Sequence, residues 1–64
     1  MMKMTLRMYN VRTDAWQTQY RASSAERAIE AALRAEPISP EAWEDGAWII
    51  ATAVDGTDSA SRGR

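Results

Sequence analysis

The apolar residues of this 64-residue chain change their spacing at Ser23, and the change separates a strand-like part from a helix-like part. Residues 3–9 and 16–22 alternate between two kinds of side chain, which is the period of a half-buried β-strand. From residue 25 the apolar positions are three and four apart, as on one face of an α-helix. The sequence therefore predicts a β-hairpin followed by a helix that covers one of its faces.

The alternation also predicts which side chains of the hairpin are buried. The polar stretch 10–15 connects the two strands. The face expected to meet the helix carries Met4, Leu6, Met8, Trp16 and Tyr20. The face expected to stay open carries Lys3, Thr5, Arg7, Tyr9, Gln17, Gln19 and Arg21.

Local signals place the remaining elements. The sequence SSAE at 23–26 matches a capping box, so Ser23 or Ser24 begins a helix over residues 25–36. Ser39 and Pro40 suit the cap and first position of a short helix over 40–45, which Gly46 ends. Residues 47–54 form a third strand with apolar groups on both faces, which indicates extra burial or a second contact surface.

These elements predict an α+β fold in the chain order β-β-α-(short α)-β. Its three-stranded antiparallel sheet has the order 2-1-3, with one main helix packed on one face. Residues 1–56 form a single small domain, and residues 57–64 form a disordered C-terminal tail rich in Ser, Gly and Arg.

Composition removes several classes of protein. The chain has no Cys and no His, so disulfides, thiolate zinc sites and imidazole ligands are excluded, and we expect no metal and no cofactor. Nucleophilic catalysis requires a base beside the nucleophile, and this chain offers no such pair. We therefore expect no catalytic residues and no enzyme. The chain carries neither a secretory signal nor an apolar run long enough for a membrane span, and we expect a cytoplasmic protein.

Charge is distributed unevenly behind a formal net charge of −1. Residues 1–35 carry six cations and three anions, whereas residues 36–58 carry six anions and no cation. Those anions are Glu36, Glu41, Glu44, Asp45, Asp55 and Asp58. Such a segment fits a basic surface, and Trp43 within it is of the type found at interface hot spots.

Two other interpretations of the acidic segment remain open. Glu41 and Asp45 are four residues apart, as in a carboxylate pair that binds a hard cation, although we favour a solvated acidic helix as their explanation. The sequence DGTD at 55–58 matches part of a calcium loop and also an ordinary turn.

The basic half of the chain supports an alternative function, a small nucleic-acid-binding module that uses the open face of the hairpin. The candidate residues are Lys3, Arg7, Tyr9, Arg12 and Arg21.

The passage from the second strand into the helix resembles that of small phage and mobile-element β-β-α-β proteins. Ala22, Ser24 and Ala28 match the A-x-S-x-x-x-A passage of some anti-CRISPR inhibitors of type I surveillance complexes. The similarity spans roughly residues 4–35. It implies a small binding protein and carries no functional residue of that family onto this chain.

Together these observations predict a non-enzymatic inhibitor or adaptor that occludes the surface of a protein partner. The partner is expected to be a nucleic-acid-binding complex with a basic channel, such as a CRISPR surveillance complex. We expect a monomer or weak homodimer. The predicted partner-binding residues are Glu36, Glu41, Trp43, Glu44, Asp45, Asp55 and Asp58.

Overall fold

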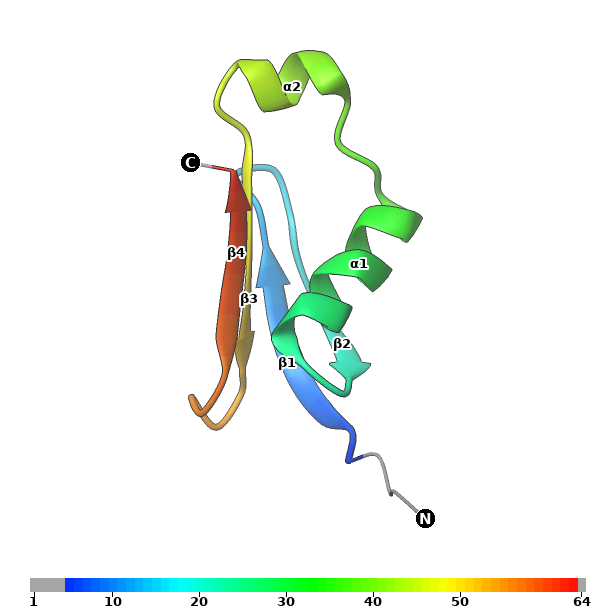
Figure 1. The fold of residues 1–64 in the computed structure, drawn as a ribbon, viewed down its shortest axis with the longest axis vertical. Coiled ribbons are helices and arrows are strands. Elements are labelled where there is room, and N and C mark those ends of the chain that lie inside the picture. Colours follow the sequence, from blue (N-terminus) through cyan, green and yellow to red (C-terminus); the bar gives the residue numbers. More distant parts are fainter. Residues whose placement is uncertain (1–4, 64) are drawn as a thin grey trace.

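The computed structural model describes residues 5–63, which form a four-stranded sheet with one main helix on one face (Figure 1). The elements in chain order are β1 (Arg7–Arg12), β2 (Gln17–Ala22), α1 (Ala25–Ala35), α2 (Pro40–Glu44), β3 (Trp48–Ala53) and β4 (Ser59–Gly63). The sheet order is β2-β1-β3-β4, and every neighbouring pair is antiparallel. The α+β class and the order of the first three strands are therefore as predicted.

The fourth strand corrects the prediction of three strands and a disordered tail. Residues Ser59–Gly63 pair with Trp48–Thr52 of β3 along the full length of β4. Ala60 packs against the core from this strand, and Arg62 reaches across to α1. The sequence of β4 did not predict a strand, because its side chains are short and mostly polar. The strand forms through its pairing with β3 and its contacts with α1, and not through its own hydrophobicity.

The face of β1 that meets the helix is the opposite of the predicted one. Tyr9 and Val11 are completely buried, whereas Leu6 and Met8 are 55% and 36% exposed. Met4 lies outside the described residues. The strand spans residues 7–12 and not 3–9, and within 7–12 the apolar side chains of one face are Tyr9 and Val11. The expected strand included residues 3–6, so Met4 and Leu6 determined which face was predicted to be apolar, and these two residues lie outside β1.

Both helices begin at serine caps. Ser24, with extended backbone, accepts a hydrogen bond from the Arg27 amide at 3.2 Å, and Ser39 accepts one from the Ala42 amide at 3.1 Å. With Ser24 as the N-cap, Glu26 is at the second helical position and not at the third, which a capping box requires, and its carboxylate binds Arg62 instead. Gly46 has a φ of 96°, which ends the segment that contains α2.

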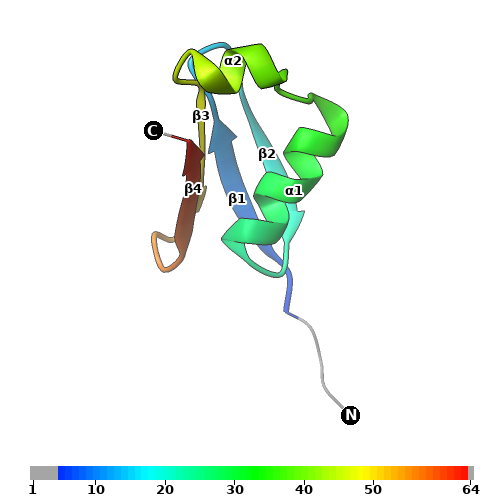
Figure 2. The same cartoon turned by 45° about the horizontal axis from the view of Figure 1, so that its top comes forward.

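The core lies between α1 and the sheet, and α1 contacts all four strands (Figure 2). Alanines on the helix allow this close approach, and three large side chains from the strands fill the space. The buried hydrophobic residues are Tyr9, Val11, Ala22, Ala25, Ala28, Ile29, Ala32, Ile49, Ala51 and Ala53.

The second face of the sheet is not covered by any helix of the described chain. We call it the open face. From the strand registers it carries Met8, Asn10, Arg12, Gln17, Gln19, Arg21, Trp48, Ile50, Thr52, Ser59 and Ser61.

Candidate protein-binding site at the α2 end of the sheet

A groove lies where the β1–β2 loop, the end of α1 and α2 meet, at the upper end of the sheet in Figure 1. It consists of two hollows of about 370 and 410 Å³, which share Trp16 and Glu36 in their linings. We call it the Trp16 groove. The larger hollow is bounded by residues 13–16 and 36–39, and by Ala42, Ala47 and Trp48.

Local hydrogen bonds fix the loop that presents Trp16. The Thr13 hydroxyl accepts from the amides of Ala15 and Trp16 at 3.0 and 3.2 Å, and the Thr13 amide donates to the Trp16 carbonyl at 2.8 Å. This turn brings the half-buried indole back over the sheet. On the opposite side, Pro37 and Ser39 lead directly into α2, so both walls of the groove are built from short, constrained segments.

Two carboxylates line this groove, and three more belong to the neighbouring α2 segment. Asp14 and Glu36 are in its lining and are exposed. Glu41, Glu44 and Asp45 belong to α2 or its C-cap, and they are exposed as well. Within residues 5–63 none of these five side chains forms an ion pair.

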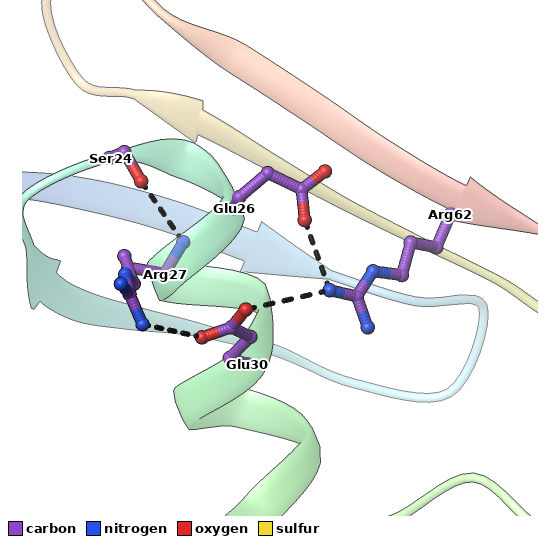
Figure 3. Close-up of polar contacts among 5 residues, drawn as sticks. All are labelled: Ser24, Glu26, Arg27, Glu30 and Arg62. Atoms are coloured by element: carbon purple, nitrogen blue, oxygen red, sulfur yellow. Dashed lines mark hydrogen bonds and ion pairs between the residues drawn. The ribbon is translucent and has the colours of Figure 1, made fainter.

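The carboxylates of α1 are different. Figure 3 shows Arg62 of β4 between Glu26 and Glu30, with its guanidinium 3.0 Å and 3.9 Å from their carboxylate oxygens. Arg27 forms a further ion pair with Glu30 at 3.2 Å. The negative charge of α1 is therefore compensated within the fold, and the negative charge around the Trp16 groove is available to a partner.

The predicted acidic residues do not form a single surface. Asp55 and Asp58 lie in the β3–β4 connection, at the end of the sheet opposite α2 (Figure 1). The structure thus brings together Glu36, Glu41, Glu44 and Asp45, and it separates Asp55 and Asp58 from them.

Asp55 and Asp58 are also occupied by contacts inside the molecule. Asp58 Oδ2 accepts from the Tyr9 hydroxyl at 2.9 Å and from the Ala25 amide at 3.0 Å. These bonds, the Tyr9 one above all, lower the pKa of Asp58, and burial together with the Asp58 contact raises the pKa of Tyr9. The Thr57 hydroxyl and amide donate to Asp55 at 2.7 and 3.1 Å and lower its pKa.

The two tryptophans near the acidic segment take different places. Trp43 is half-buried and packs from α2 against the core, so it acts as a cover residue. Trp48 lines the groove at the start of β3. Arg12 borders this position, with its guanidinium carbon 5.9 Å from the centroid of the Trp48 ring.

The basic candidate set is divided between the two faces of the sheet. Arg21 is on the open face, as predicted, and Arg12, which was expected in the connection 10–15, is on the open face at the end of β1. Tyr9 is buried, and Arg7 lies on the helix side, where its guanidinium donates to the Thr57 hydroxyl at 3.2 Å. Lys3 lies outside the described residues.

Residues 5–63 contain neither a metal-binding group of carboxylates nor a membrane-spanning helix. No group of three Asp or Glu side chains is arranged to hold a metal ion in this part of the chain. Neither α1 nor α2 is long and apolar enough to cross a bilayer.

Comparisons with protein-family models, curated proteins and solved structures find no match to this chain.

The sequence prediction missed Asp14 and Trp16 as members of the site. Trp16 was expected only in the core, and Asp14 stands 22 positions before Glu36 in the chain. A usable signal was the polar loop NVRTDA next to a tryptophan, because a tryptophan beside a hairpin loop reaches the edge of the core and not its centre.

Proposed function

We propose that this chain is a non-enzymatic inhibitor or adaptor that binds a basic surface of a protein partner with the Trp16 groove and the carboxylates around it. One observation carries the proposal. An apolar groove with two tryptophans in its lining has two exposed carboxylates in that lining and three more on the adjacent α2 segment, and none of the five is in an ion pair within residues 5–63.

The groove suits an arginine or lysine side chain. The aliphatic stem of such a side chain packs on an indole face, and its charged head group reaches carboxylates at the rim. Asp14 and Glu36 stand on opposite walls of the groove and provide such acceptors. Charge-assisted hydrogen bonds of this kind are stronger than neutral ones, so a basic residue would anchor the complex.

The exposed acids of α2 extend this surface beyond the groove. Glu41, Glu44 and Asp45 attract a basic partner over a longer range and speed its association. A protein with a basic, phosphate-binding channel is the class of partner that fits, and a type I CRISPR surveillance complex is the example suggested by the resemblance at Ala22, Ser24 and Ala28. Binding there occludes the channel without any chemical step.

A pull-down from host lysate with matched charge reversals tests this proposal. Glu41→Lys with Glu44→Lys changes the α2 end, and Glu26→Lys with Glu30→Lys makes the same change of charge on α1. We expect the α2 variant to lose a basic partner by about tenfold or more, and the control to retain it. Capture by the wild-type chain should weaken as salt is raised. Equal binding by the wild-type chain and the α2 variant would refute the proposal, as would an equal loss in the control.

A further inference from the structure

The open face of the sheet carries a concentration of exposed apolar side chains at one end. Leu6, Met8 and Val54 are the exposed large hydrophobic residues among residues 5–63. Met8 and Val54 are on adjacent strands, since the Val54 amide donates to the Met8 carbonyl at 3.0 Å, and Leu6 is two residues before Met8. This end is away from α2, so the apolar cluster is separate from the Trp16 groove.

Half-buried apolar groups continue the cluster along β3. Ile50 lies on the same face of β3 as Val54, with Thr52 between them, and Trp48 lies beyond Ile50, where it also lines the Trp16 groove. Two polar side chains of this face are hydrogen-bonded to each other, because the Gln19 side-chain amide donates to Asn10 Oδ1 at 2.8 Å. The open face therefore presents an exposed apolar cluster at one end, with the half-buried Ile50 further along β3, and an exposed cluster of this kind on a small domain marks a contact surface.

Charge on this face has one sign. Among the side chains that the four strands present there, Arg12 and Arg21 are the charged ones. Arg21 is directly opposite Met8 in the β1–β2 register, so a cation stands beside the exposed cluster. Neither arginine forms an ion pair within residues 5–63.

This pattern selects the kind of partner. A second copy stacked face to face would bring like charges together in an apolar contact, which is unfavourable. A single-stranded nucleic acid needs aromatic platforms for its bases, but Tyr9 and Tyr20 face the helix, and the open face offers Trp48 alone. An apolar protein segment that also carries carboxylates can pack on the exposed apolar cluster and form ion pairs with the two arginines.

We infer that the open face is a second docking surface, which binds an apolar and acidic segment of a protein partner. Its chemistry is opposite to that of the Trp16 groove, so the two surfaces bind different partners. The chain would then act as an adaptor that holds a basic surface at its α2 end and an acidic segment on its sheet.

Selection from a displayed library of short random peptides tests this inference, with the full chain as bait. Peptides that also bind the Leu6→Ser, Val54→Ser double variant are removed first. We expect the enriched peptides to combine apolar residues with Asp or Glu. By fluorescence anisotropy, the affinity of one such peptide should fall at least about tenfold in the Leu6→Ser, Val54→Ser variant and in an Arg12→Ser, Arg21→Ser variant. It should stay within about twofold in the Glu41→Lys, Glu44→Lys variant.

Several outcomes would overturn the inference. They are the absence of enrichment, the enrichment of basic peptides, and affinities that are equal in the wild-type chain and both open-face variants. Sedimentation that shows self-association abolished by the Leu6→Ser, Val54→Ser change would assign the face to a second copy. Saturable binding of a short oligouridine, lost in the Arg12→Ser, Arg21→Ser variant, would assign it to nucleic acid. The substituted side chains are exposed, and an unchanged thermal midpoint checks that the variants fold.

Discussion

Asp58 joins three parts of the fold through one carboxylate. Its Oδ2 accepts from the Tyr9 hydroxyl on β1 and from the Ala25 amide at the start of α1, while its own backbone precedes β4. An anion at this place is also favoured by the helix dipole. Because Tyr9 is completely buried, its hydroxyl depends on an acceptor inside the fold, and Asp58 provides that acceptor.

The replacement Asp58→Asn should alter how stability depends on pH. The folded-state pKa of Asp58 is below its ordinary value of 3.8, so its contribution is present above that pH and is lost as pH falls through the folded pKa. We expect Asp58→Asn to have a lower thermal midpoint at neutral pH and a shallower loss of stability below pH 4. Thermal melts between about pH 2 and pH 7 measure this. Asp45→Asn, at an exposed position, is the control. If the thermal midpoint of Asp58→Asn fell below pH 4 as steeply as that of the wild-type chain, the role given to the Asp58 carboxylate would be contradicted.

At the scale of single elements, the helices were predictable from local sequence and β4 was not. Ser24, Ser39, Pro40 and Gly46 act within a few residues of themselves, so their roles can be recognised without knowing the fold. The strand β4 depends on partners that are distant in sequence, since Arg62 meets Glu26 and Glu30 of α1. A strand of serine, alanine and glycine carries no periodic apolar signal of its own.

A chain that ends at Asp58 tests whether β4 is part of the folding unit. Five residue pairs join β4 to β3, and a backbone hydrogen bond contributes a net of about 1 kcal/mol. A domain of this size has only about 3–5 kcal/mol of stability to lose. We therefore expect the shortened chain to be largely unfolded by circular dichroism and to lack a cooperative melt.

The replacement Arg62→Ala separates the strand from its ion pairs. Both partners are substantially exposed, so this change should cost less than about 1 kcal/mol and leave a cooperative melt. A cooperative melt of the shortened chain near the wild-type midpoint would show that β4 contributes nothing to the folded state.

At the scale of the whole molecule, folding rearranges the charge pattern of the sequence. The six acids of residues 36–58 lie in one segment without a cation, but the turn between β3 and β4 carries Asp55 and Asp58 to the end of the sheet opposite α2. Asp14, from the basic half of the chain, joins Glu36 in the Trp16 groove. Charge segregation was therefore visible in the sequence, whereas the membership of each surface required the register of the sheet.

The most direct measurement follows the backbone amides of the labelled chain by nuclear magnetic resonance during a titration with an oligoarginine peptide at low salt. Arginine provides the charge and the stem that the Trp16 groove is proposed to bind. The account predicts saturable shift changes confined to residues 13–16 and 36–48. Changes of equal size at the β3–β4 turn, or no change in either segment, would contradict it.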